Sequence, residues 1–152
     1  MGDGFSHVDE EGRARMVDVS GKALELRVAR ASGQIQLAEA TVKLIADASI
    51  KKGDVLAVAE IAGVQAAKRT PGLIPLCHPL GITKIDVKAT LHPHGVSMES
   101  YVSCVARTGV EMEALTAVSV ALLTVYDMCK GVDKSMKIGE IMLTEKLKSP
   151  IE

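Results

Sequence analysis

The sequence predicts an α+β fold in which helices pack on one face of an antiparallel sheet. Apolar and polar residues alternate between residues 82 and 106 on both sides of a His-Pro-His-Gly turn, which indicates two paired strands. Stretches with helical spacing of apolar residues flank this hairpin, and a further alternating stretch follows near the carboxyl end. The chain has 152 residues and is 47% hydrophobic, which suffices for one compact domain with a core.

The first third of the chain is expected to hold an arm and the first strands. Residues 1–14 are mostly polar and are predicted to form a flexible arm. Residues 15–19 (RMVDV) predict a short strand. Alternation over residues 23–37 predicts a hairpin that turns near Ser32 and Gly33.

Two helices and a rigid loop are expected next. Apolar residues recur at helical spacing over residues 41–48 and 55–68, and Asp54 is placed to cap the second of these helices. Residues 70–81 contain three prolines and two glycines. Because proline lacks a backbone donor and restricts the chain, this stretch is predicted to be a fixed loop.

The second half is expected to alternate strands with one long helix. Residues 82–91 and 96–106 form the predicted hairpin, an apolar helix follows it, and residues 137–146 form the last strand. This order of elements resembles a ferredoxin-like unit. The catalytic domain is predicted to span residues 15–148, with a short tail at residues 149–152.

Composition excludes several classes of function. Aromatic residues make up 2% of the chain, too few for base-stacking nucleic-acid modules, and a net charge of −1 gives no general attraction for polyanions. The 3 cysteines are widely spaced, which indicates neither a disulfide framework nor a zinc knuckle. The amino terminus lacks the apolar core of a signal peptide, and the apolar run at residues 114–126 is too short to span a membrane. A soluble protein of the reducing cytoplasm is therefore expected.

Charged residues crowd both ends of the long apolar helix. At its start, Thr108 and Glu111 have the spacing of a capping box, so structure and function explain Glu111 equally well. Glu113 has no capping role and precedes a wholly apolar run, which favours a functional role for it.

At the other end, Asp127, Lys130 and Lys134 share one helix face. A surface ion pair explains Asp127, but an aspartate near a helix C-terminus opposes the helix dipole, so a functional role explains it equally well. On one straight helix Glu113 lies about 21 Å from Asp127. One site can use both only if two subunits contribute to it or the helix breaks.

His78 and a set of basic residues complete the candidates. His78 follows Cys77 in the proline-stiffened loop, where a rigidly held imidazole suits proton transfer near neutral pH; a histidine bonded to backbone is the alternative. No third ligand lies near this pair in the sequence, so a metal site is not indicated. Basic residues at helix ends would together neutralise a phosphorylated ligand, although each one alone suits a helix dipole. They are Lys51, Lys52, Lys68, Arg69, Lys130 and Lys134.

Four long motifs distinguish the sequence: residues 62–70 (AGVQAAKRT), 73–80 (LIPLCHPL), 108–117 (TGVEMEALTA) and 126–130 (YDMCK). They closely resemble the cyclic pyranopterin monophosphate synthase family of molybdenum cofactor biosynthesis, the accessory protein C family. Arg15-Met16-Val17-Asp18-Val19 and Lys52-Gly53-Asp54-Val55 also match its pattern. The resemblance therefore covers nearly the whole chain, in order.

The resemblance implies a lyase. Its substrate would be a cyclised dihydroguanosine triphosphate made by an upstream radical enzyme, and its products cyclic pyranopterin monophosphate and pyrophosphate. The resemblance also implies a ferredoxin-like fold assembled as a trimer of dimers, with active sites at the dimer interface. Nothing in the sequence requires a metal or an organic cofactor.

Residue by residue, the resemblance makes Asp127 the catalytic aspartate, and we expect Lys130, His78 and Lys52 to act with it. The expected substrate-binding residues are Leu76, Cys77, His78, Met112, Glu113, Glu111, Lys68, Arg69 and Lys134. Which group is the acid and which the base does not follow from sequence. The family usually continues into a Gly-Gly-Lys-Ser-Gly-like tail, and in this chain Lys146 or Lys148 would stand in for its lysine.

Two other classes of function stay open from the residues alone. A non-catalytic oligomeric module that binds a nucleotide needs bases for phosphate but no proton-transfer group, so Asp127 and His78 favour the enzyme. A metal carrier is disfavoured because the sequence lacks ligand spacing.

Overall fold

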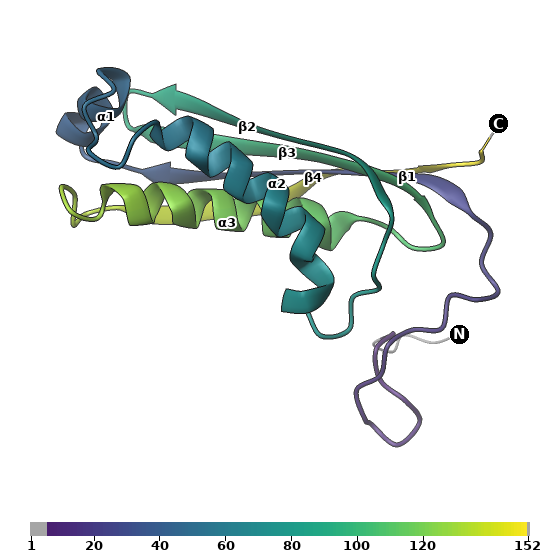
Figure 1. Cartoon of the computed structure of the whole chain (residues 1–152). Coiled ribbons are helices and arrows are strands. Elements are labelled where there is room, and N and C mark those ends of the chain that lie inside the picture. The colour runs from purple at the N-terminus through teal and green to yellow at the C-terminus, as the bar shows by residue number, and fades with distance from the viewer. Residues whose placement is uncertain (1–5, 152) are drawn as a thin grey trace.

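The chain has an α+β fold with one four-stranded antiparallel sheet and three helices (Figure 1). The computed structural model describes residues 6–151, so residues 1–5 of the predicted arm and Glu152 of the predicted tail lie outside the described residues. The strand order is β2-β3-β1-β4. The elements are β1 (Glu25–Gln36), α1 (Glu39–Ala46), α2 (Val55–Leu73), β2 (Ile82–His92), β3 (Gly95–Ala106), α3 (Glu111–Cys129) and β4 (Lys137–Ser149).

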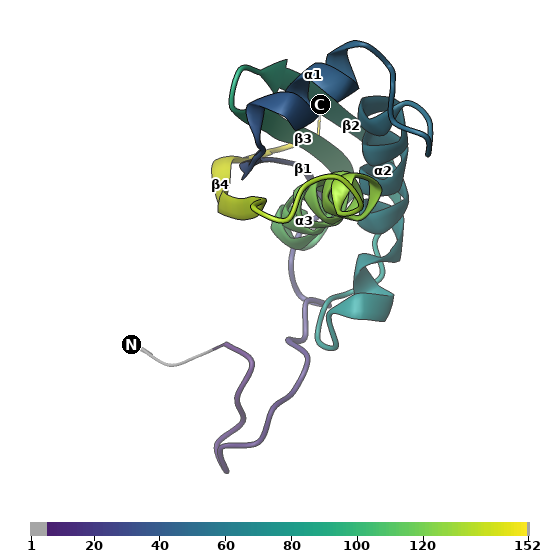
Figure 2. The same cartoon turned by 90° about the vertical axis from the view of Figure 1, so that its left-hand side faces the viewer.

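Helices α2 and α3 cover one face of the sheet, as the end view makes plain (Figure 2). The alternation of the strands explains this layer, because every second side chain of β1 and β3 points toward the helices. Ala29, Ala31 and Ile35 of β1 and Met98 and Val102 of β3 are fully or almost fully buried there. The core therefore lies between this face of the sheet and the two long helices.

Helix α3 runs from Glu111 to Cys129 without a break. By length and composition the whole helix is apolar enough to cross a membrane, whereas the expectation concerned only its uncharged run at residues 114–126. Half of the longer apolar stretch is buried inside the fold, where α3 packs against both α2 and the sheet. Its hydrophobicity is that of a core helix.

Several sequence predictions are confirmed. The hairpin of β2 and β3 pairs from Ile82 to His92 with a turn before Gly95, and α1 forms at the predicted place. Asp54 caps α2, since its Oδ1 accepts a hydrogen bond from the Ala57 N–H at 3.0 Å. Strand β4 also forms, and it extends to Ser149, the first residue of the predicted tail.

The predicted hairpin at residues 23–37 is wrong, because these residues form the single long strand β1. Gly33 is not a turn residue. A Cβ atom at this position would lie 2.9 Å from Leu122 Cδ1 and 2.9 Å from Val118 Cγ1, so glycine allows α3 to approach the sheet. The register against β4 shifts on both sides of Ser32, and the bulged pairing keeps the strand continuous.

Two further predictions before β2 are corrected. Residues 15–19 form no strand; they belong to the extended segment before β1 and have no strand partner. The predicted fixed loop at residues 70–81 begins too early, since α2 continues to Leu73 with Pro71 in its last turn. In this turn the hydroxyl of Thr70, the residue before the proline, donates to the Ala66 carbonyl one helical turn earlier, at 3.2 Å.

The predicted capping box at the start of α3 is also wrong. The N-cap residue is Val110, and no side chain caps the helix there. Glu111 instead forms an ion pair with Lys146 of β4. An ion pair between α3 and β4 therefore replaces the local contact that the spacing predicted.

Candidate functional site

The first group of candidate residues lies at the C-terminal end of α3; Lys52, Asp127 and Lys130 form what we call the Asp127 cluster. Lys52 Nζ donates to the Asp127 carbonyl oxygen at 2.9 Å and to Oδ2 at 3.1 Å. Lys130 Nζ lies 2.6 Å from the other carboxylate oxygen, Oδ1. Each oxygen of the carboxylate therefore has its own lysine.

Local structure explains how the Asp127 cluster forms. Asp127 lies in the last turn of α3 and Lys130 is its C-cap residue, so the helix itself sets their spacing. Lys52 comes from the turn after α1, 75 residues earlier in the chain than Asp127. Lys134 extends the group, since its Nζ donates to the Lys130 carbonyl. Lysines here also complement the negative end of the helix dipole.

The electrostatics of the Asp127 cluster favour charged side chains. Hydrogen bonds from Lys130 and Lys52 hold the pKa of Asp127 below its usual value, and Asp127 in turn raises the pKa of Lys130. The Asp127 and Lys130 side chains are both 57% exposed, so an incoming ligand can reach them. Two lysines beside one exposed carboxylate form a site where an anionic ligand can replace Asp127 as the partner of the lysines.

The second group lies at the N-terminal end of α3; Leu76, Cys77, Met112 and Glu113 form what we call the Glu113 cluster. The first three of these line an apolar pocket of about 540 Å³. Its other lining residues are His7, Ala14, Ile74 and Pro75. The loop after α2 and the segment before β1 thus close over the start of α3.

Glu113 is the buried acid of this group, with 3% of its surface exposed. Burial raises its pKa, the nearby charge of Glu111 raises it further, and its own backbone N–H lowers it. Burial and the charge of Glu113 also raise the pKa of the Cys77 thiol. Among the described residues no basic side chain pairs with Glu113, so its carboxylate has no opposite charge within the chain.

His78 lies beside the Glu113 cluster and has a backbone partner. Its Nε2 is 2.8 Å from the carbonyl oxygen of Val17. A carbonyl only accepts, so this bond places the proton on Nε2 and leaves Nδ1 as the acceptor of the neutral ring. The hydrogen bond between His78 and backbone that the sequence left open is thus present, and Nδ1 can still exchange a proton with a ligand.

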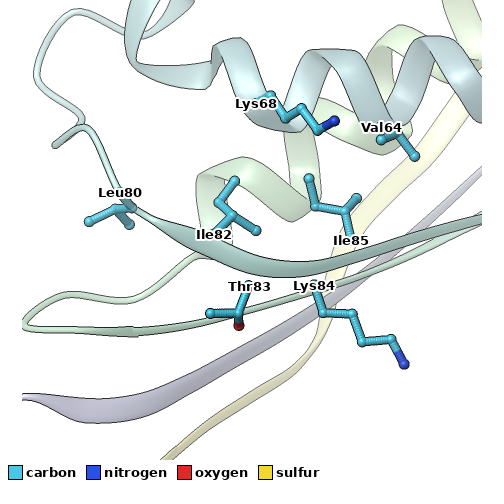
Figure 3. Close-up of a pocket in the computed structure, with 7 residues that line it drawn as sticks. All are labelled: Val64, Lys68, Leu80, Ile82, Thr83, Lys84 and Ile85. Carbon is cyan, nitrogen blue, oxygen red and sulfur yellow. The ribbon is translucent and has the colours of Figure 1, made fainter.

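Lys68 occupies a separate pocket of about 420 Å³ between α2 and β2 (Figure 3). Figure 3 shows Lys68 above Ile82 and Ile85, whereas Lys84 points to the opposite side of the strand. Leu80, two residues after His78, also lines this pocket. Lys68 therefore belongs with the His78 loop rather than with the Asp127 cluster, and Arg69 is exposed on the same helix.

Glu111 is engaged within the chain, through its ion pair with Lys146. Burial raises its pKa, but the hydrogen bonds from Lys146 and from its own backbone N–H, with the charges of Lys146 and Arg27, together outweigh this, so that its pKa is lowered. Sequence reasoning did not anticipate this pair, although it singled out both residues. It also missed the Val17 carbonyl as the partner of His78, for which the sequence holds no signal because any residue supplies a carbonyl.

The structure therefore separates the candidates into two groups. The Asp127 cluster lies with α1 at one end of the molecule, and the Glu113 cluster lies at the other end with the loop after α2 (Figure 1). Helix α3 is continuous, so Glu113 and Asp127 are about 21 Å apart along it. In the part of the chain that the structure describes, no three potential metal-binding side chains gather at either end.

Comparisons with known proteins give one consistent result. Residues 16–149 match the model of the MoaC family. The chain is 56% identical over 143 residues to cyclic pyranopterin monophosphate synthase 1 of Mycobacterium tuberculosis, covering 93% of this chain and 84% of that protein. It is 55% identical to the cyclic pyranopterin monophosphate synthase of Desulfitobacterium hafniense and 54% identical to that of Parvibaculum lavamentivorans. The alignments cover 93% of this chain in both cases, and 88% and 90% of those two proteins.

Proposed function

This chain belongs to the MoaC family, and from that premise we propose that it is a lyase of molybdenum cofactor biosynthesis. It converts a cyclised dihydroguanosine triphosphate to cyclic pyranopterin monophosphate and releases pyrophosphate. The relatives named as cyclic pyranopterin monophosphate synthases support the reaction, and they do not favour the non-catalytic binding module.

One observation supports a shared active site more than any other: two groups of chemically apt residues lie at opposite ends of one unbroken helix. The Asp127 cluster is suited to phosphate and proton transfer, and the Glu113 cluster is suited to a heterocycle. The two acids are about 21 Å apart along α3, so one small pocket within a single chain does not hold both. One active site therefore uses the Asp127 cluster of one subunit and the Glu113 cluster of another.

At the Asp127 cluster, the lysines bind the triphosphate. Phosphate oxygens attract Lys52 and Lys130 away from Asp127, with Lys134 adding charge. Because those lysines lower the pKa of Asp127, their recruitment returns that pKa toward its usual value and makes the carboxylate a better base. Closing the cyclic phosphate takes a proton from a hydroxyl group while pyrophosphate departs, and Asp127 is placed to hold that proton.

At the Glu113 cluster, the pterin-forming ring is recognised. The carboxyl group of Glu113 accepts hydrogen bonds from the guanine-type amino edge, and Leu76 and Met112 provide the apolar walls. His78 exchanges protons through Nδ1 during ring opening, since Nε2 is held by Val17. Lys68 and Arg69 contribute positive charge from α2 on the same side.

The wider setting of the enzyme follows from the same premise. The strand order and the single layer of helices support a ferredoxin-like assignment of the fold. The proposed assembly is a trimer of dimers with the active site at the dimer interface. An upstream radical enzyme supplies the substrate, and the reaction takes place in the cytoplasm.

The test is turnover of the cyclised dihydroguanosine triphosphate by the purified protein, followed as pyrophosphate release. Asp127→Ala is expected to lower the rate about 100- to 10,000-fold, the usual contribution of a general acid or base. Asp86→Ala is the matched control, because Asp86 is an exposed aspartate paired with Lys84 on β2. Its rate is expected to equal that of the wild type.

Mixing two inactive variants tests whether subunits share the site. If Asp127→Ala and Glu113→Gln subunits are unfolded together, mixed and refolded, about a quarter of the sites contain both native clusters, and that activity returns. If the mixture releases no pyrophosphate although both variants are folded and assembled, each active site lies within one chain. Tight binding of the triphosphate by the wild type without pyrophosphate release would favour the binding module.

A further inference from the structure

Asp133 is a buried carboxylate that has no place in the mechanism above. It lies in the turn between α3 and β4 and is 4% exposed. Its Oδ2 accepts hydrogen bonds from the Ala38 N–H at 2.8 Å and the Thr41 hydroxyl at 3.0 Å. Its Oδ1 accepts from the N–H and the hydroxyl of Ser135, both at 2.8 Å. A buried charge is rarely retained with so complete a set of donors unless it holds separate segments in place.

The four hydrogen bonds join two segments that are distant in sequence. Ala38 is the N-cap residue of α1 and supplies no side-chain cap of its own, so Asp133 takes over the role of a capping carboxylate from outside the helix. Helix α1 needs such an anchor because Thr41 and Ile45 are its buried residues. The anchored helix leads directly into the turn that carries Lys52.

The other side of Asp133 holds the turn after α3. The Asp133 N–H donates to the Cys129 carbonyl at 3.0 Å. The N–H of Ser135, two residues later, donates back to the Asp133 carboxylate and closes the turn. Lys130 and Lys134 lie on either side of this carboxylate in the chain. The helix that leads to Lys52 and the turn that carries Lys130 and Lys134 therefore meet at one buried group.

We propose that Asp133 is a positioning residue for the Asp127 cluster: it ties the start of α1 to the turn after α3 and so sets where Lys52 and Lys130 meet Asp127. This inference rests on the proposed function for its effect on rate. It rests on the hydrogen bonds alone for its effect on structure. Burial raises the pKa of Asp133, but the bonds from Ala38, Ser135 and Thr41 outweigh it and lower that pKa to about 2. The carboxylate thus stays charged at any ordinary assay pH.

The test uses Asp133→Asn in the full chain, because the amide nitrogen replaces an acceptor with a donor that faces other donors. The rate of pyrophosphate release is expected to fall about 10-fold or more through misplacement of Lys52. In the double variant Lys52→Met/Asp133→Asn, the further loss caused by Asp133→Asn is expected to be clearly smaller than its loss in the wild type, since only Lys130 is then left to position. Multiplying losses in the double variant would overturn the proposal.

Hydrogen exchange gives a readout that does not depend on activity. In Asp133→Asn the amides of residues 38–53 and 130–135 are expected to exchange faster, while those of β1 and β3 are unchanged. Val102→Ala, a core substitution in β3, serves as the control for general loss of stability and is expected to spare residues 47–53. Unchanged exchange at residues 47–53 in Asp133→Asn overturns the proposal. Absence of turnover in the wild type would instead count against the proposed function. The hydrogen-exchange measurement would then still decide whether Asp133 positions these segments.

Discussion

The two ends of α3 deal with charge in opposite ways. At the C-terminal end, Asp127 is exposed and both of its carboxylate oxygens are paired with lysines. At the N-terminal end, Glu113 is buried beside an apolar pocket, and burial raises its pKa. An exposed paired acid costs the fold little, whereas a buried acid opposes folding unless it is protonated or finds a donor.

This contrast indicates which end is complete within one chain. The Asp127 cluster already has its opposite charges and needs a ligand only to replace them. Among the described residues no basic side chain pairs with Glu113, and its own backbone N–H is the donor that lowers its pKa, so a ligand or another subunit has more to supply there. Substitutions at the two ends should therefore differ in kind: those at the Asp127 cluster should change the rate, and those at Glu113 should change both the rate and the pH dependence of stability.

Replacing Lys52 should have the largest of the remaining effects on function. Lys52→Met keeps much of the side-chain length but removes both hydrogen bonds to Asp127 and one phosphate-binding charge. We expect kcat/KM for pyrophosphate release to fall about 10- to 100-fold, as for loss of a charge-assisted contact. Lys84→Met is the matched control, since Lys84 pairs with Asp86 on β2, and equal losses in both variants would contradict the assignment.

The packing of α2 against α3, the helix that joins the two ends, is tested at Gly63 of α2. A Cβ atom there would lie 2.9 Å from Val87 Cγ1 and 3.0 Å from the Ala117 carbonyl oxygen. Gly63→Ala should therefore push α2 from α3 and lower the free energy of unfolding by about 1–3 kcal/mol, read from urea titrations. Gly72→Ala in the same helix meets nothing within 4 Å and should be neutral or stabilising by up to about 1 kcal/mol. Similar losses in both would mean that helix packing is not the cause.

The pH dependence of stability should have opposite signs for two acids in the first turn of α3. Burial raises the pKa of Glu113, so its contribution to stability is complete below the unfolded pKa and is lost as pH rises through the folded pKa. Glu113→Gln should thus gain stability relative to the wild type as pH rises from about 4.3, the reference value for glutamate. Unfolding by urea at a series of pH values measures this difference.

Glu111→Gln should show the reverse. Although burial opposes it, Lys146 lowers the pKa of Glu111, so its contribution is present above the unfolded pKa and is lost as pH falls through the folded pKa. The variant should therefore lose stability relative to the wild type at neutral pH and match it in acid. Slopes of equal sign for the two acids would refute the contrast between a buried and a paired carboxylate.

The smallest effect is expected at Thr108. A capping threonine usually contributes about 1 kcal/mol, but here no side chain caps α3. Thr108→Ala should change the free energy of unfolding by less than about 0.5 kcal/mol. Asp54→Ala, which removes a real cap from α2, should cost about 1 kcal/mol and provides the comparison.

The sequence by itself determined the features that depend on neighbours along the chain. Periodicity predicted the helices and the hairpin of β2 and β3, and helical spacing placed Asp127 beside Lys130. The distance between Glu113 and Asp127 also followed from helix geometry, and the unbroken α3 confirms its premise. The four motifs carried the family, which the comparisons confirm.

Only the tertiary structure decided which distant segments meet. It brings Lys52 to Asp127, Lys146 to Glu111 and the Val17 carbonyl to His78. The glycine at position 33 predicted a turn, but in the structure it allows the close approach of α3 to β1. The physical reason is that local patterns specify which face of an element is buried, whereas contacts between elements depend on how those faces pack in three dimensions.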